Sequence, residues 1–378
     1  MEHFKQAILA CATLALAGCA AQQPYFATHT NASELAQIHE LHVVSVVAQN
    51  KLDAQHNSTY VNPVVTGAPL AAGLVGGLIA GALISAEENH EAHEFAEKHL
   101  APLLTTLAGY DGRAAMRGTL HQGLATLPVR LADWRAIDAE TKDADLLPSD
   151  ATTGSAWLIL RSDYGMTPDF SGLQVVTHAS LYVGGSDGNW RHTPVYANDL
   201  TYQSSLRTMP DKSDAVRKQM TDEEDARYAK LDVTQQIAQA NAGSPYDPAN
   251  AQRRQRIHDE QWQHEAALKQ IASPYWSPDE RASHFVAEWQ QDDAAAIKQS
   301  ISEGGTQTAR MLAIDLEQAQ PDLGKETKRE WVTIYHDAQR SIQDAPDGSV
   351  FSVANGDVTH GAAFLNQTTH VHVTPMAH

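Results

Sequence analysis

The sequence predicts an α+β protein in which an antiparallel sheet meander is packed by helices. Residues 156–161 are apolar on both faces and end in Arg161, and residues 173–183 alternate between apolar and polar side chains, as neighbouring strands do. Apolar positions at helical spacing recur between residues 285 and 316. A glycine-rich segment at 67–85 adds a helix or helix pair near the N-terminus, and a charged stretch over 206–275 adds a peripheral helical hairpin.

The chain begins with a short apolar run that ends in Leu16-Ala17-Gly18-Cys19. This run follows Lys5 and is far shorter than the roughly 20 residues that a helix needs to cross a bilayer. It resembles the signal of bacterial lipoproteins, in which a peptidase cuts before the cysteine and the cysteine is acylated. The resemblance implies a signal peptide over residues 1–18, a lipid on Cys19 and a tether over residues 19–40.

The same resemblance implies a location in the cell envelope. Ala20 follows the cysteine, and in this class an aspartate there favours retention in the inner membrane. We therefore expect a protein that is anchored to the outer membrane by its lipid and faces the periplasm. Cys11 leaves with the signal peptide, so Cys19 is the only cysteine of the mature chain and no internal disulfide can form.

Composition narrows the range of partners. The 378 residues contain 27 Lys and Arg against 46 Asp and Glu, which gives a net charge of −19. Such an acidic surface repels nucleic acid and anionic lipid head groups, and we expect no nucleic-acid partner. A chain of this length can form one large core or two modest ones.

We predict an α+β core over residues 41–205. Residues 41–48 are rich in valine and predict a strand that is buried on both faces. Residues 87–109 and 113–127 predict two helices that are separated by a break at Tyr110-Asp111-Gly112.

The glycine-rich segment lies inside this region. Gly73, Gly77 and Gly81 recur at every fourth residue, and Ser85 continues the row, so a helix would present them as a groove that allows close backbone approach. The pattern resembles the glycine zipper of some envelope proteins. Three interpretations stay open, namely insertion into the membrane, a helix or helix pair packed inside the globule, and self-association through the groove.

Three further strands are expected to form the meander. The first two are residues 156–161 and 173–183, and a turn at Gly184-Gly185-Ser186-Asp187-Gly188 leads to the third, residues 190–202. Pro194 interrupts the last of these and predicts an edge strand or a bulge.

The stretch over 206–275 has few large apolar residues and is predicted to be a helical insertion. Gly243-Ser244-Pro245 separates its two halves. Thr221-Asp222-Glu223-Glu224 and Ser277-Pro278-Asp279-Glu280 both have the spacing of a capping box, which predicts that a helix begins at each.

Residues 276–378 are expected to complete the core. One helix carries Phe285 and Ile301, and a second follows a break at Gly304-Gly305. Strand-like runs then occur at 330–335, 350–353 and 370–373, with a turn at Asp347-Gly348.

Catalytic motifs give little support for an enzyme. Residues 184–188 match the nucleophile elbow of hydrolases, but that motif requires a helix after the serine, and here a strand is expected on both sides. Glycines and an aspartate at a reversal are better explained by a hairpin turn. The sequence has no phosphate-binding loop, dinucleotide fingerprint or complete zincin motif.

The 19 histidines offer the main alternative, which is metal binding. His90, Glu94 and Glu97 fall on one face of a predicted helix, where an imidazole and two carboxylates can hold a divalent transition metal. His370 and His372 project to one side of a predicted strand, with His360 or His378 as a further ligand. The simpler explanation of both groups is a solvated helix face and an exposed terminal strand, without a cofactor.

Two classes of function follow. The first is a noncatalytic envelope lipoprotein that binds another envelope protein or a second copy of itself through residues 67–85. The alternative is a periplasmic metal-binding accessory protein that uses the histidines at 90–97 and 360–378. An enzyme is the least favoured, because no acid, base and nucleophile can be selected from the sequence.

Overall fold

The computed structural model describes residues 27–28, 35–54, 94–127, 129–185, 188–190, 193–243, 247–317, 331–345 and 348–357. These residues form a mixed α/β fold with one large sheet. The chain divides into two compact units. Residues Met1–Leu206 and Glu288–His378 form the sheet unit, and Arg207–Ala287 form the helical unit. The sequence predicted an insertion that ends at residue 275, whereas the helical unit continues to Ala287. The prediction placed the boundary earlier because the helix that begins near Ser277 carries apolar positions that suit the core.

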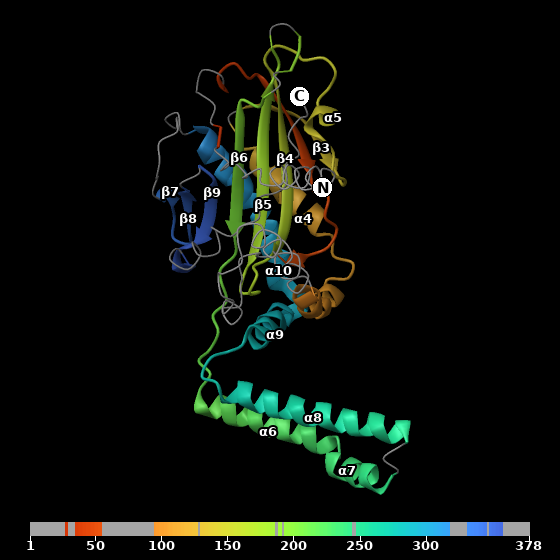
Figure 1. The fold of residues 1–378 in the computed structure, drawn as a ribbon. Coiled ribbons are helices and arrows are strands. Elements are labelled where there is room, and N and C mark those ends of the chain that lie inside the picture. The colour runs from red at the N-terminus through yellow and green to blue at the C-terminus, as the bar shows by residue number, and fades with distance from the viewer. Residues whose placement is uncertain are drawn as a thin grey trace, which may run out of the picture. The chain divides into compact units, whose positions relative to one another are not determined.

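The sheet contains nine described strands in the order β3-β1-β4-β5-β6-β9-β8-β7, and the short β2 pairs with β4 beside β1 (Figure 1). The strands are β1 Glu40–Val46, β2 Asp53–Ala54, β3 Leu131–Ile137, β4 Ser155–Met166, β5 Leu173–Val183, β6 Tyr196–Gln203, β7 Val332–His336, β8 Arg340–Asp344 and β9 Val350–Ala354.

The predicted antiparallel meander is confirmed for β4, β5 and β6, but the sheet as a whole is mixed. β1 pairs in parallel with β3 and with β4, and β9 pairs in parallel with β6. Parallel neighbours need a crossover connection, and the helices between β1 and β3 return the chain to the same end of the sheet. The expectation of an antiparallel sheet was therefore wrong beyond the meander.

β1 confirms the strand that the valine-rich run predicted. Val43 and Val44 point to opposite faces and both have no exposed surface. β1 has parallel neighbours on both edges, and the burial of both valines shows that its two faces are covered as well, which suits a continuous apolar run.

Three longer helical segments accompany the sheet in its unit. Residues 94–106 are helical, α4 is Gly112–Leu124 and α10 is Gln291–Glu317, while α5, Asp143–Leu146, is a single turn. The predicted break before α4 is confirmed. Gly109 has a φ of 87°, which favours glycine, and the side chain of Asp111 accepts a hydrogen bond from the amide of Ala114. Figure 1 shows α10 and α4 behind the meander, on one face of the sheet.

α10 runs without interruption through Gly304 and Gly305, so the predicted break there was wrong. The two glycines are packing positions. A Cβ on Gly304 would lie 2.9 Å from Cβ of Val175 on β5, and a Cβ on Gly305 would lie 3.1 Å from the backbone nitrogen of Leu120 on α4. One glycine thus brings α10 against the sheet, and the other brings α4 against α10.

Several strands differ from expectation, and the short β2 and the edge strand β3 were not predicted at all. β6 lies between β5 and β9 rather than at an edge, because Pro194 precedes the strand and takes no place in its ladder. β8 was not predicted, since its sequence Arg-Ser-Ile-Gln-Asp is mostly polar, yet all five of its residues are buried.

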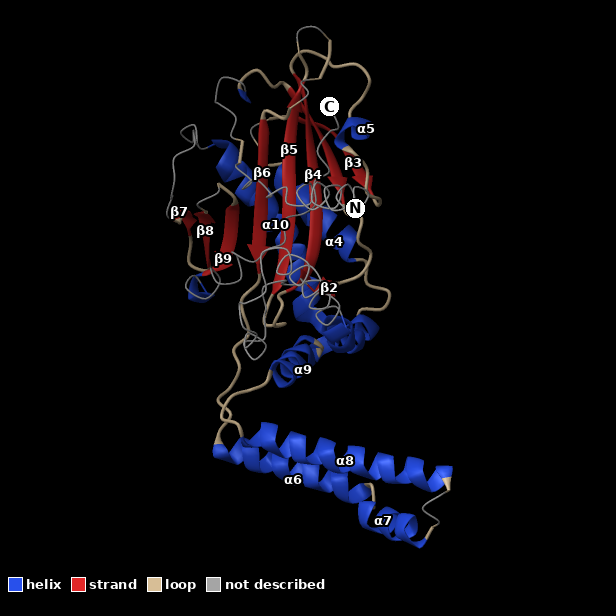
Figure 2. Cartoon of the chain, viewed as in Figure 1, coloured by secondary structure: helices blue, strands red, loops and turns tan. Residues whose placement is uncertain are grey.

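The helical unit contains α6 Asp214–Lys230, α7 Val233–Ala242 and α8 Pro248–Ala272, and α9, Pro278–Trp289, runs from it into the sheet unit. Figure 2 shows α8 alongside α6, which confirms the predicted hairpin. The capping box at Ser277 and Glu280 is also confirmed by two reciprocal hydrogen bonds of 2.7 and 3.2 Å. The box predicted at Thr221 was wrong, because α6 begins earlier and Ser213 caps it.

Candidate functional site

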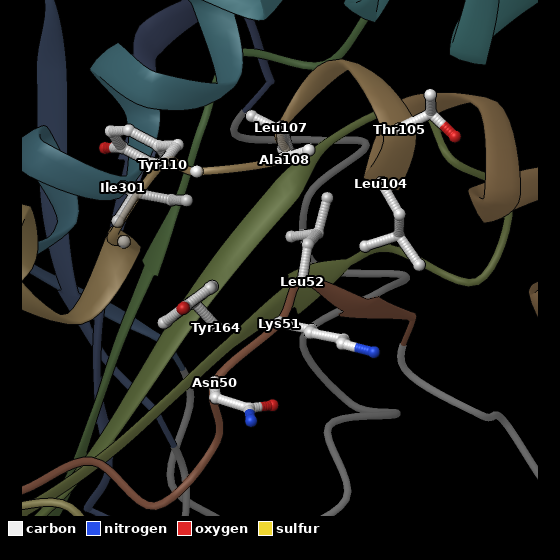
Figure 3. Close-up of a pocket in the computed structure, with 12 residues that line it drawn as sticks. Asn50, Lys51, Leu52, Leu104, Thr105, Leu107, Ala108, Tyr110, Tyr164 and Ile301 are labelled. Atoms are coloured by element: carbon white, nitrogen blue, oxygen red, sulfur yellow. The ribbon is translucent and has the colours of Figure 1, made fainter.

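The sheet unit contains a pocket of about 400 Å³ near the end of β4. Its floor is apolar and buried, and its rim includes exposed polar residues. Figure 3 shows Leu52 in the middle of the group, between Leu104 and Tyr164. The lining residues are Asn50, Lys51, Leu52, Leu104, Thr105, Leu107, Ala108, Gly109, Tyr110, Gly112, Tyr164 and Ile301.

Tyr164 supplies a hydroxyl to the wall of this pocket. The residue is 4% exposed, and a Cβ on Gly112 would lie only 2.8 Å from its hydroxyl oxygen, so the first residue of α4 must be small. Among the described residues, no group forms a hydrogen bond with this hydroxyl. Burial raises the pKa of Tyr164 to about 12, and the side chain is therefore a neutral hydrogen-bond donor near pH 7.

Tyr110 forms a second aromatic wall that is held in place. Its hydroxyl donates to the backbone carbonyl of Lys298 over 3.1 Å, and the ammonium of Lys298 lies 5.7 Å from the ring centroid. Burial raises the pKa of Tyr110. In the sequence, Tyr110 stands out only as part of a helix break, and Lys51, Leu52 and Tyr164 do not stand out at all. Nothing in their local pattern shows that segments so far apart in the sequence meet.

A row of polar side chains crosses the opposite face of the meander from α10. Arg161 on β4, His178 on β5 and Asp199 on β6 are direct neighbours in the ladder. Arg161 donates from Nε to Asp143 over 3.0 Å, and the Tyr182 hydroxyl donates to the second oxygen of Asp143 over 2.8 Å. Burial raises the pKa of Tyr182, so this phenol stays protonated. Arg161 and Tyr182 thus tie α5 to the sheet.

Ser180, His178 and Asp199 have the connectivity of a nucleophile, base and carboxylate. The His178 Nδ1 lies 2.8 Å from an Asp199 oxygen, and its Nε2 lies 3.1 Å from the Ser180 hydroxyl. The same chain of contacts activates serine in hydrolases. The arrangement was not predicted, because no sequence motif connects these residues, although two of them alternate along one strand.

The surroundings of Ser180 argue against catalysis. Ser180 is 2% exposed and His178 is 4% exposed, so a substrate cannot reach them in this conformation. Ser180 lies in the middle of β5, flanked by Ile159 of β4 and Ala197 of β6. Backbone amides inside a sheet are engaged in its ladder and cannot stabilise an oxyanion. We assign these three residues to the polar interior of the sheet.

The residues selected from the sequence fall mostly outside the described part of the chain. This applies to Cys19, to the row Gly73, Gly77, Gly81 and Ser85, and to His90, His370 and His372. Glu94 and Glu97 are described and lie exposed on the helix over residues 94–106. Within the described residues, no three His, Cys, Asp or Glu side chains form a group that could hold a metal ion.

The glycine-rich stretch after β5 makes a reversal. Gly184 forms an antiparallel bridge with Trp190, and the amide of Gly188 donates to the carbonyl of Gly185 over 3.2 Å. The chain then enters β6, which is a strand. A nucleophile elbow needs a helix at that place, whereas the described residues here join two strands; Ser186 and Asp187 lie outside the described part of the chain.

Among its described residues, the helical unit exposes two large aromatic side chains. Trp262 on α8 is 65% exposed, and Tyr275 is 80% exposed. Between α6 and α8, a compact network joins Glu224 to Arg227 and to His264, and the His264 ring stacks on Tyr228 at 4.0 Å. The pKa of Glu224 falls to about 2, chiefly because Arg227 donates hydrogen bonds to its carboxylate.

The chain matches no protein-family model, and neither curated proteins nor solved structures give a significant match. Among the helices that the structure describes, none has both the length and the apolar character required to span a bilayer.

Proposed function

We propose that this protein is a lipoprotein of the bacterial outer membrane that faces the periplasm and has a noncatalytic, protein-binding role. The anchor would be a lipid on Cys19, at the end of the signal-like sequence Leu16-Ala17-Gly18-Cys19. The partner would be another envelope protein or a second copy of the chain.

The observation that carries the proposal is the surface of the helical unit. This unit has 11 Lys and Arg against 13 Asp and Glu, a net charge of −2 within a chain of −19. It is thus far less repulsive to an acidic partner than the rest of the chain. Exposed tryptophan and tyrosine side chains are enriched at protein interfaces because they offer a large apolar area with a polar tip.

The interface would centre on Trp262. Its neighbours one helical turn away are His258 and Asp259 on one side and Glu265 and Ala266 on the other. A tryptophan ringed by smaller and polar side chains is a typical energetic centre of an interface. The buried position of Ser180 supports a noncatalytic role, because the strongest catalytic arrangement in the described residues has no access for a substrate.

Cross-linking in the native host tests the interface. A photoreactive amino acid in place of Trp262 should give one discrete adduct, whose mass identifies either a second copy or another envelope protein. The control is the same amino acid in place of Val332, which is also apolar and 54% exposed but lies in the sheet unit. Equal adducts at both positions, or none at Trp262, would contradict the proposal.

Intact-mass spectrometry of the protein from its host tests the anchor. We expect a chain that begins at an acylated Cys19, and we expect Cys19→Ser to move the protein from the membrane fraction to the soluble fraction. An unmodified chain that still begins at Met1 would refute the anchor.

Self-association through the row of Gly73, Gly77 and Gly81 is a separate part of the proposal. Deletion of residues 67–85 should lower the mass that light scattering measures for the purified protein. An unchanged mass would remove this segment from the interface.

A further inference from the structure

The pocket beside Tyr164 has no part in the proposed interface. We propose that it binds a small amphipathic carboxylate, whose acyl or aryl body lies on the apolar floor and whose carboxylate lies at the rim near Lys51. This site is independent of the lipid anchor and of the surface around Trp262.

The floor suits an apolar body. Leu52, Leu107 and Ile301 are 6%, 9% and 1% exposed, and the ring of Tyr164 continues the same surface. A volume of about 400 Å³ falls within the range of small-molecule pockets, which are mostly apolar and carry a few polar groups that fix orientation.

The polar groups of the pocket favour a ligand whose hydrogen-bond acceptor group is negatively charged. Lys51 is the single charged residue among the twelve that line it. Within the described residues, neither the Lys51 ammonium nor the Asn50 amide has an ion pair or a side-chain hydrogen bond. The Tyr164 hydroxyl adds a neutral donor.

Two carboxylates lie near Tyr164, but neither faces the ligand directly. Asp111 accepts a hydrogen bond from the amide of Ala114 over 3.1 Å and lies 3.7 Å from Arg113, so its charge is partly compensated. Asp163 precedes Tyr164 on β4, and adjacent residues of a strand point to opposite faces of the sheet.

The pocket is organised before any ligand binds. The side chain of Gln49 donates to the backbone carbonyls of Tyr164 and Lys51, at 2.5 and 2.8 Å, and it accepts from the Tyr164 amide at 2.8 Å. One amide side chain therefore ties the segment that carries Lys51 and Leu52 to the strand that carries Tyr164. Such preorganisation lowers the entropy cost of binding.

Titration calorimetry on the purified full chain tests the proposal with decanoate, decanol and decyltrimethylammonium as probes. We expect decanoate to bind about tenfold more tightly than decanol, and decyltrimethylammonium to bind weakest. Lys51→Gln should reduce the affinity for decanoate to that for decanol. Lys142→Gln, which removes an exposed lysine outside the pocket, should leave all three affinities unchanged.

Two further variants separate the pocket from general apolar binding. Leu104→Trp should fill the space and abolish binding of every probe, while its thermal unfolding, followed by circular dichroism, shows that it is folded. Tyr164→Phe removes only the hydroxyl and should lower the affinity for decanoate several-fold. Absence of decanoate binding at about 1 mM would overturn the site. Equal affinity for decanoate and decanol, or a Lys51→Gln variant that binds decanoate normally, would overturn the assignment of a carboxylate.

Discussion

At the scale of single residues, the sheet unit depends on buried polar groups that satisfy one another. Asp143 and Arg161 are each 7% exposed, and Asp143 also accepts a hydrogen bond from Tyr182. A buried pair of this kind stabilises little by itself, but removal of Asp143 leaves the Arg161 charge in a poorly solvated place with only the exposed Glu140 carboxylate, at 3.5 Å, as an ionic partner.

Asp143→Ala should therefore lower the free energy of unfolding by about 3 kcal/mol, because Arg161 stays buried. Urea denaturation measures this loss. The control is Asp145→Ala, which removes a carboxylate from the same helical turn, where the side chain is exposed. An equal loss in both variants would show that the helix terminus, rather than the ion pair, is responsible.

Gly304 in α10 lies at a position where the packing leaves no room for a larger side chain. A Cβ on Gly304 would lie too close to the side chain of Val175, which has no exposed surface and no room to move. We expect Gly304→Ala to destabilise the protein by about 1–3 kcal/mol despite the better helix propensity of alanine.

Gly118→Ala is the matched control for Gly304→Ala. Gly118 also lies inside a helix, α4, but a Cβ added there would meet no atom within 4 Å. This variant should gain about 1 kcal/mol from helix propensity alone. The two changes in the midpoint of urea unfolding should thus have opposite signs, and a gain in both would contradict the packing of α10 described above.

At the scale of elements, two sequences with the spacing of a capping box can be compared. Ser277 and Glu280 bond reciprocally at the start of α9, whereas Thr221 and Glu224 have the same spacing but lie inside α6. Sequence spacing could not separate the two sites, because the apolar periodicity that would mark the start of α6 is weak there.

Ser277→Ala should cost about 1 kcal/mol, since it exposes an amide that the cap satisfies. Thr221→Ala removes no cap and should change stability by less than about 0.5 kcal/mol or raise it slightly. Thermal unfolding of both variants measures these changes in stability. A large loss of stability in Thr221→Ala would mean that α6 begins where the sequence placed it.

The helical unit should respond to acid through Glu224. Its folded-state pKa of about 2 lies below the ordinary value of 4.5, so the folded unit holds this carboxylate in its charged form more strongly than the unfolded chain does. The stabilisation is fully present above about pH 4.5 and is lost as the pH falls from about 4.5 toward about 2.

Glu224→Gln should flatten this dependence when the midpoint of thermal unfolding is compared between pH 5 and pH 3. Glu223→Gln is the control, because it removes the neighbouring carboxylate on the exposed side of α6 without touching Arg227 or His264. A slope in Glu224→Gln that equals that of the unmodified protein would contradict the network.

At the scale of the whole molecule, local patterns predicted much of the secondary structure but little of the site. The valine-rich run, the alternation over 173–183 and the charged hairpin each follow from the chain's own periodicity. The parallel pairing of β1 and β9 does not, because it depends on how distant segments return to the sheet. β8 was missed for a related reason, since its polar side chains are buried only after α10 and β9 cover them.

The pocket was equally hidden from the sequence. Lys51, Tyr110 and Tyr164 lie on three segments that are far apart along the chain, and only the fold brings them together. The selected lipidation, glycine and histidine residues remain predictions, since they lie outside the described residues. Glu94 and Glu97 are described and exposed on one helix.

The insertion of the helical unit into the sheet unit has a consequence for biosynthesis. The chain emerges from its N-terminus, so β1 to β6 are made before the helical unit, while α10 and β7 to β9 are made after it. The hairpin has local contacts and should fold as soon as it appears, whereas the meander must wait for α10 with its apolar face open. A chain that has been made or exported only as far as residue 287 would therefore contain a folded hairpin and an incomplete sheet that is prone to aggregate. A chaperone would be needed most at this stage.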